Sequence, residues 1–311
     1  MTRTYEQIEG DMTMQNQSRR NFLSTALGLG AAASITSPFK AFGAEKPGSK
    51  MKFGLVTYLW GQHWDLPTLI ANCEASRVLG VELRTTHKHG VEPTLTPEQR
   101  KEVKKRFDDS PVDFVGIGSN EAFDHTDPEA LKKAIQATKD FIKLSQDCGG
   151  SGVKVKPNNL HKDAEAPEVT IKRIGKALNE VAAFGVDYGQ QIRLEVHGQC
   201  QELPIMKQIM DVADHPNVTV CWNSNSPDLE GEGLEHNFNL VKGRFGATAH
   251  VRELNEGDYP YQDLINLFVK MDYAGWILLE GRTDPQDKIA ALIEQQKVFN
   301  EMVAKAQQAL A

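Results

Sequence analysis

The sequence predicts an α/β fold consisting of a single (β/α)8 TIM barrel, and three observations support this. From residue 51 onward, short apolar runs alternate with longer amphipathic segments, as parallel strands alternate with crossover helices. Eight runs can be counted, spaced by roughly thirty residues, which suits about 250 residues divided among eight βα units. The turn after the first run, 59–64, has no Gly-rich phosphate-binding pattern, which argues against a doubly wound nucleotide-binding sheet.

The predicted strands and helices follow from these runs and from the helix start signals between them. We expect strands at 53–59, 80–84, 114–117, 153–155, 192–196, 218–222, 247–251 and 276–280. Thr96 and Gln99 have the spacing of a capping box, with a proline at the first helical position. Asp127 and Asp284 each precede a proline in the same way, so further helices are predicted to begin at these two positions.

The first 44 residues resemble an export signal. Arg19 and Arg20 lie in a stretch that resembles the twin-arginine signature, an apolar run follows at 23–35, and small residues at 41–44 offer a cleavage site. An uncleaved anchor is the alternative, but roughly thirteen apolar residues are fewer than the roughly twenty that span a bilayer. We therefore predict a signal peptide at 1–44, a linker at 45–50 and the barrel at 51–311. The mature protein would be periplasmic or secreted, without stable membrane insertion.

Composition narrows the class of protein further. The chain of 311 residues has 40% hydrophobic and 25% charged residues, as globular proteins do, and its formal charge of −7 argues against nucleic-acid binding. Four cysteines occur without a C-x-x-C pair, at 73, 148, 200 and 221. A disulfide is open to an exported protein, but buried free thiols are the favoured interpretation because Cys73 falls on an apolar helical face and Cys221 inside a strand.

Polar side chains gather at the ends of the last four predicted strands. Alternation along each strand sends Glu195, Asn223, His250 and Glu280 to the inner face, at the rim where the strands end. Two carboxylates, an imidazole and an amide oxygen form a mixed set of donors that suits one divalent ion such as Mn²⁺, Mg²⁺ or Co²⁺. The alternative is a network of buried salt bridges in which arginines or lysines neutralise the glutamates.

Other side chains are expected at the same rim. Lys154 is expected to pair with Glu82 deeper in the barrel, whereas Lys156 could polarise a carbonyl. Trp60 could form part of a sugar-stacking wall or could simply pack. The residues predicted to contact a substrate are His197, Lys156, Arg252, Arg282, His87 and Trp60.

The order Glu, Asn, His, Glu at these strand ends resembles the xylose isomerase-like TIM-barrel superfamily, in particular the sugar phosphate isomerase/epimerase family. The most specific matching segments are 194–198, Leu-Glu-Val-His-Gly, and 278–281, Leu-Leu-Glu-Gly. The resemblance implies one divalent metal ion held by the four strand-end residues, with Glu195 and Glu280 as catalytic acid/base groups. The sequence departs from the family where Asn223 and Ser226 replace an aspartate and a histidine, which weakens expected metal binding and puts ordinary ketose epimerisation in doubt.

These features predict a metal-dependent isomerase or epimerase that removes a proton next to a carbonyl of a carbohydrate. Two alternatives stay open. The same site could cleave a 3-keto-glycoside by β-elimination, or the barrel could be a non-catalytic periplasmic sugar-binding protein. The resemblance also implies a homo-oligomer.

Overall fold

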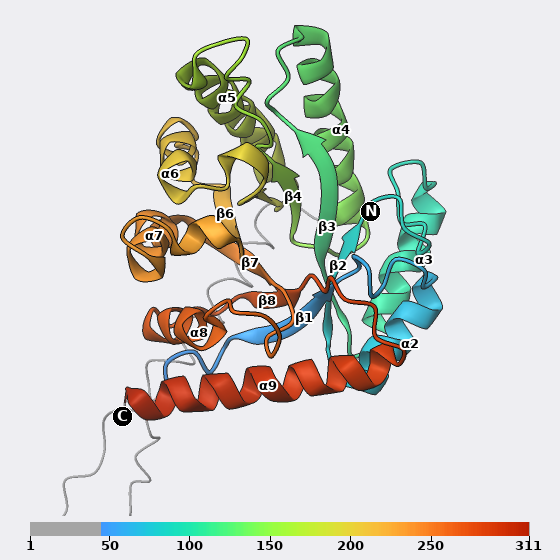
Figure 1. Ribbon diagram of the computed structural model, residues 1–311. Helices are drawn as coiled ribbons and strands as arrows, with labels where there is room; N and C mark the ends of the chain where they lie inside the picture. Colours follow the sequence, from blue (N-terminus) through green and yellow to red (C-terminus); the bar gives the residue numbers. More distant parts are fainter. Residues whose placement is uncertain (1–44, 311) are drawn as a thin grey trace, which may run out of the picture. The chain divides into compact units, whose positions relative to one another are not determined.

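The structure, a computed structural model, describes residues 45–310 and contains a closed barrel of eight parallel strands (Figure 1). The strands pair in chain order, and β8 closes the barrel by pairing with β1. This confirms the predicted TIM barrel and all eight strands. Their bounds are β1 Lys52–Val56, β2 Gly80–Arg84, β3 Asp113–Ala122, β4 Gly152–Lys156, β5 Gln191–Glu195, β6 Val218–Asn223, β7 Phe245–Val251 and β8 Trp276–Leu279.

The helices lie outside the strands, as Figure 1 shows. The longest, α9, runs along one edge of the barrel and packs against the first and last of the preceding helices, α2 and α8. Their bounds are α2 Leu66–Ser76, α3 Pro97–Asp108, α4 Pro128–Asp147, α5 Pro167–Val186, α6 Leu203–Val212, α7 Leu234–Val241, α8 Tyr261–Lys270 and α9 Lys288–Ala309.

Two of the three predicted helix starts are confirmed. At α3, the Thr96 hydroxyl accepts from the Gln99 amide at 3.3 Å and the Gln99 side chain accepts from the Thr96 amide at 2.8 Å. Asp127 caps α4. The third prediction was wrong, because α9 begins three residues beyond Pro285, where the Asp287 carboxylate accepts from two backbone amides of the first turn. Capping bonds of this kind decide where a helix starts.

The apolar core lies between the strands and the surrounding helices, and only a small second cluster, Val56, Val115 and Leu278, is separate from it. On β5, Leu194 is fully buried in the main core, while Arg193 on the opposite, inner face is also buried. Buried charged side chains therefore share the inside of the barrel with the small apolar cluster. Such groups remain buried only when they are paired.

The structure describes the N-terminal part of the chain from residue 45 onward. The predicted export signal, 1–44, lies outside the described residues. Two residues of the expected linker, 45–50, are hydrogen-bonded to the barrel: Asp272 accepts from the Gly48 amide at 2.8 Å, and Gln307 donates to the Pro47 carbonyl at 3.0 Å. No helix of the described part has the length and hydropathy needed to cross a membrane.

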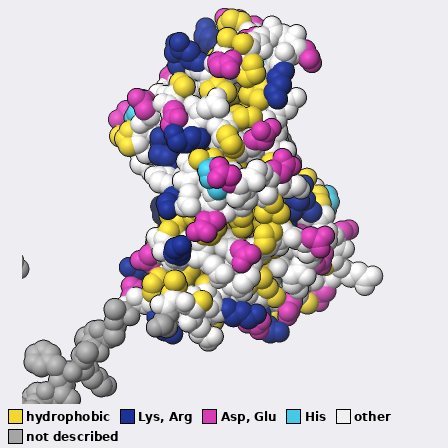
Figure 2. All heavy atoms as spheres, turned by 60° about the vertical axis from the view of Figure 1, so that its left-hand side comes forward, with side chains coloured by type: hydrophobic (Ala, Val, Ile, Leu, Met, Phe, Trp, Pro, Cys, Tyr) yellow, Lys and Arg dark blue, Asp and Glu magenta, His cyan; other side chains and the backbone are white. Residues whose placement is uncertain are grey.

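All four cysteines are buried and free, which confirms the predicted free thiols. Figure 2 shows one face of the molecule, on which acidic and basic side chains are interspersed and apolar ones lie between them. Charge of one sign is thus not concentrated on this outer face.

Candidate metal centre

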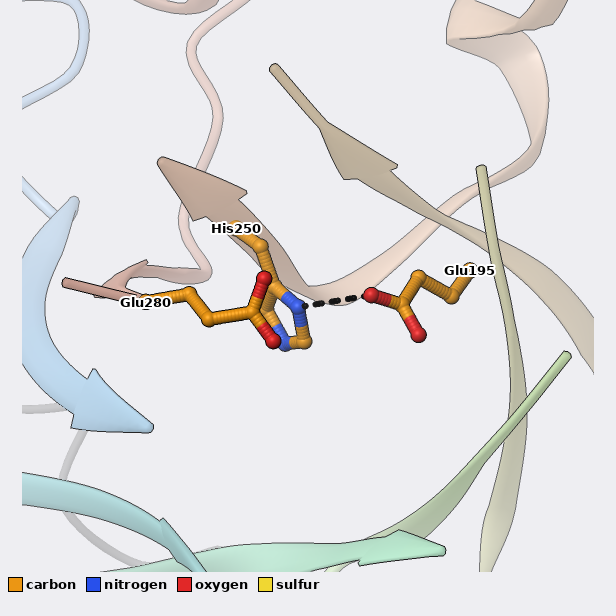
Figure 3. A group of neighbouring side chains, drawn as sticks. All are labelled: Glu195, His250 and Glu280. Atoms are coloured by element: carbon orange, nitrogen blue, oxygen red, sulfur yellow. Dashed lines mark ion pairs between the residues drawn. The ribbon is translucent and has the colours of Figure 1, made fainter. Parts of the chain in front are cut away.

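Three of the four predicted metal ligands meet inside the barrel. Glu195 ends β5, His250 lies near the end of β7, and Glu280 directly follows β8. Their exposed fractions are 1%, 0% and 4%, and each offers one ligand atom within 4.8 Å of the other two. Figure 3 shows the two carboxylates approaching the imidazole from different strands, with His250 Nδ1 at 3.6 Å from Glu195 Oε1.

Asn223, the fourth predicted ligand, ends β6 next to this group. Its amide nitrogen donates to Glu195 Oε1 at 2.9 Å. Its amide oxygen is buried and makes no hydrogen bond with any described residue. The strand ends therefore bring together all four side chains, and Asn223 both orients Glu195 and has an oxygen left to offer.

The residues present fit a divalent ion. The Nδ1 atom of His250 makes no hydrogen bond within the described part of the chain, and the same is true of the Asn223 amide oxygen. Buried polar atoms are normally bonded, so unbonded ones that converge on two carboxylates indicate a place for a ligand. Carboxylate, amide and imidazole donors suit Mn²⁺, Mg²⁺ or Co²⁺ and do not discriminate among them.

Lys154 modifies this centre in a way that the sequence prediction missed. Its ammonium lies 2.7 Å from Glu195 Oε2, and both side chains are almost completely buried. The expected pair between Lys154 and Glu82 is therefore corrected. Burial opposes both charges, yet the attraction between them prevails, so that the Glu195 pKa is well below its usual value and the Lys154 pKa is raised.

Glu82 lies deeper, on the other side of the imidazole. Its Oε1 is 3.2 Å from His250 Nε2, so His250 lies between two carboxylates. Burial opposes a charge on the ring, but Cys221, Glu82 and Glu195 outweigh it and raise the His250 pKa well above the usual value. Arg193, which sequence reasoning did not select, contributes a further positive charge near Glu82.

Lys156 and Arg84 lie at the rim above the centre. Lys156 Nζ donates to Asn120 Oδ1 at 3.0 Å, and Arg84 Nη2 donates to the same oxygen at 3.1 Å. Arg84 Nη1 is also 3.5 Å from Glu280 Oε1. Burial, followed by repulsion from Lys154, lowers the Lys156 pKa to about 8. Arg84 was overlooked, although it ends its strand on the same face as Glu82 and alternation alone could have found it.

His197 occupies the rim beyond Glu195, as predicted. Its Nδ1 lies 2.9 Å from Asn158 Oδ1, which fixes the ring. The following residue, Gly198, has φ +67°, and a Cβ there would lie 2.6 Å from the Asn158 carbonyl oxygen. The close approach of the two loops therefore requires glycine. Burial lowers the His197 pKa, against the attraction of Glu195.

Trp60 and His87 lie in the loops after β1 and β2. The Trp60 indole is only 3% exposed, packs close to Gly281 and donates to the Thr283 carbonyl at 2.9 Å. This position agrees with the packing alternative. His87 Nδ1 lies 3.2 Å from the Thr57 hydroxyl, and burial together with His89 and Arg84 lowers its pKa to about 4.

The two predicted rim arginines differ in how firmly they are held. Arg252 reaches Asn225 Oδ1 at 3.5 Å, and its buried Nε has no hydrogen-bond partner in residues 45–310. Arg282 is about half exposed, with Nη2 at 3.9 Å from Glu280 Oε2. Glu253 holds the Arg282 backbone amide at 2.8 Å and so orients the loop that follows Glu280.

Comparison with known proteins finds one matching family model and several structures of the same fold. Residues 71–225 match the family described as xylose isomerase-like TIM barrel. No curated protein sequence matches the chain significantly.

Solved structures show the same fold at low sequence identity. L-ribulose 3-epimerase superposes with a TM-score of 0.71 at 16% identity, covering 84% of this chain and 97% of the other. The 3-keto-D-glucoside 4-epimerase YcjR from E. coli gives 0.67 at 13%, covering 81% and 99%. The IOLI protein, solved with a zinc atom, gives 0.66 at 16%, covering 82% and 99%. With its closed barrel and its match over residues 71–225, the chain is similar to xylose isomerase-like TIM barrels.

Proposed function

We propose that the protein is a metal-dependent enzyme of the isomerase or epimerase type, which removes a proton next to a carbonyl of a carbohydrate. One observation carries the proposal: two buried carboxylates, Glu195 and Glu280, converge with His250 and Asn223 where the barrel strands end. This is the end at which TIM barrels carry their active sites. The structures with the same fold include sugar epimerases and a barrel with a bound zinc atom.

Glu195, Asn223, His250 and Glu280 are the side chains that would hold the ion. A bound divalent ion would polarise a carbonyl and an adjacent hydroxyl and so make the neighbouring C–H more acidic. The Mn²⁺, Mg²⁺ or Co²⁺ assignment rests on the oxygen-rich donor set.

Glu195 and Glu280 differ in their contacts, and this difference suggests different roles. Both oxygens of Glu195 are engaged, Oε2 by Lys154 at 2.7 Å and Oε1 by Asn223 at 2.9 Å. The ion pairs of Glu280 are longer, at 3.5 Å and 3.9 Å. Glu280 is therefore the better-placed base for removing the proton, and Glu195, which Lys154 and Asn223 hold in its charged form, is better suited to binding the ion.

Lys156 and Arg84 would hold a negatively charged oxygen of the substrate. Their N–H groups are held by Asn120 at the rim, and pre-positioned donors of this kind stabilise an enediolate without reorganising. Return of the proton from Glu280 to the neighbouring carbon gives isomerisation. Epimerisation needs a proton on the opposite face of the original carbon, for which the Lys154 ammonium beside Glu195 would be the source.

Solvent exchange provides a direct test, because it detects proton removal whatever the product. The purified protein, with Mn²⁺, is incubated in D₂O with a ketose or a 3-keto-glucoside, and deuterium next to the carbonyl is followed by NMR. We expect incorporation by the wild type and at least a hundredfold slower incorporation by Glu280→Gln, in keeping with loss of a general base. The exposed Glu256 provides the matched control, Glu256→Gln, which should exchange at the wild-type rate.

A folded protein that binds Mn²⁺ but catalyses no exchange with any of these substrates would instead be a sugar-binding barrel. Exchange by Glu280→Gln at the wild-type rate would remove Glu280 from the mechanism.

Export belongs to the same proposal. The twin-arginine-like segment at 18–23 supports a periplasmic or secreted enzyme. Replacing Arg19 and Arg20 by lysine should leave the protein in the cytoplasm, whereas the secreted form should begin near residue 45. Equal export of both forms would contradict this route.

A further inference from the structure

Two positively charged groups meet at one neutral oxygen on the rim. Asn120 Oδ1 accepts from Lys156 Nζ at 3.0 Å and from Arg84 Nη2 at 3.1 Å. Lys156 is only 9% exposed and has no carboxylate within 4.0 Å among the described residues. Asn120 itself is exposed, so the pair borders the open end of the barrel. A lysine that is buried without a counter-charge is costly.

The carboxylates of the rim are already matched by other cations. Glu195 is paired with Lys154, and Glu280 lies near both Arg84 and Arg282. Counting Lys156 as well, four cations face two carboxylates, which leaves an excess of two positive charges.

The deeper and outer acids do not supply the missing charge. Glu82 faces His250 and Arg193 below the centre. Glu121, whose pKa is raised by burial, attracts Lys156 from beyond 4.0 Å and forms no ion pair with it. A divalent ion bound by the strand-end residues would increase the positive excess. The unmatched charge therefore calls for an anion from outside the chain.

We propose that the substrate of this barrel carries an oxyanion, a carboxylate or a phosphate, which binds between Arg84 and Lys156. The inference rests on the proposed function for its place next to the catalytic centre, and it names the substrate class as an acidic sugar rather than a neutral one. The arginine offers a planar pair of N–H donors and the lysine a compact charge, a combination that binds oxyanions well. Arg84 also lies over the Tyr58 ring, 4.8 Å from its centroid, which holds the guanidinium in place.

Calorimetry with three matched sugars tests the proposal without requiring turnover. D-Fructose, D-fructuronate and D-fructose 6-phosphate differ only at carbon 6, and inorganic phosphate serves as a fourth probe. Each is titrated into the full-length protein, with Mn²⁺ and again with EDTA. We expect at least one anion to bind about tenfold or more tightly than D-fructose, since a hydrogen bond to a charged group contributes on that order. The preferred anion distinguishes carboxylate from phosphate.

Three variants locate the binding. Lys156→Met should weaken anion binding about tenfold or more, and Lys156→Arg should retain most of the binding. Lys88→Met is the control, because Lys88 is exposed in the loop after β2. Circular dichroism checks that each variant folds.

Anion binding that does not depend on Lys156, or its absence with all probes, overturns this inference. Deuterium exchange on neutral sugars would then still support the proposed function. Conversely, Lys156-dependent anion binding without any exchange would keep the oxyanion site and refute the catalytic role.

Discussion

Replacement of Lys154 by methionine should strongly destabilise the protein, because it would leave Glu195 charged, buried and unpaired. The two groups are 2.7 Å apart, and their side chains are 1% and 2% exposed. Removing one partner of such a pair costs about 3–5 kcal/mol of unfolding free energy, whereas replacing both partners costs less. Lys156→Met is the matched control on the same strand. Lys156 has no carboxylate within 4.0 Å among the described residues and a pKa lowered to about 8, so this change should be neutral or stabilising.

Urea denaturation in EDTA at pH 7.5 would measure these differences. The double variant Lys154→Met/Glu195→Gln should recover a large part of the loss, giving a coupling of about 2 kcal/mol or more. Added Mn²⁺ should stabilise Lys154→Met more than the wild type, because the ion would take over the neutralisation of Glu195. A loss below about 1 kcal/mol for Lys154→Met, or no coupling with Glu195, would refute the argument that this pair holds the centre together.

Two further predictions concern residues outside the centre. The fully buried Asp228 has its pKa raised by burial to about 7, so the folded state holds its proton more tightly than the unfolded state between about pH 4 and 7. The unfolding free energy of the wild type should fall as pH rises through that window. Measured by urea denaturation, the unfolding free energy of Asp228→Asn relative to the wild type should rise by about 1–3 kcal/mol from pH 5 to 8. A difference between the two proteins that does not depend on pH would contradict this. Gly198→Ala should lower the unfolding free energy by about 1–3 kcal/mol and displace His197, because the new Cβ would lie 2.6 Å from the Asn158 carbonyl oxygen. The control is Gly189→Ala, which has a similar φ of +61° but open space around it, and it should lower the unfolding free energy less. Equal losses for the two variants in the same assay would contradict the clash.

The fold could be predicted from the sequence because each of its signals is local. Alternating apolar runs mark strands, and a side chain such as Thr96 marks a helix start by a bond to its own turn. The start of α9 was misplaced for the same reason. Asp284 and Asp287 both have suitable side chains, and only the path of the chain after β8 decides that Asp287 makes the capping bonds.

Strand alternation was enough to predict which side chains face the candidate site, but not which of them pair with one another. That rule placed Glu195, Asn223, His250 and Glu280 on one rim, and the structure brings them together. Which charge pairs with which is not a local property. Lys154 contacts Glu195 instead of Glu82 because the register between strands sets how far each side chain lies along the barrel axis.

The charge of the centre bears on how it would hold an ion. Glu195 and Glu280 supply two negative charges, while Asn223 contributes a neutral donor and Lys154 offsets one of the carboxylates at 2.7 Å. A ligand set with so little net charge should bind a divalent ion weakly, since affinity rises with the number of charged ligands. The same balance explains why an anionic substrate group would help: its charge beside Lys156 would offset the excess that the ion creates. Ion and substrate should therefore bind cooperatively, and Mn²⁺ affinity measured with and without the anionic sugar would reveal that coupling.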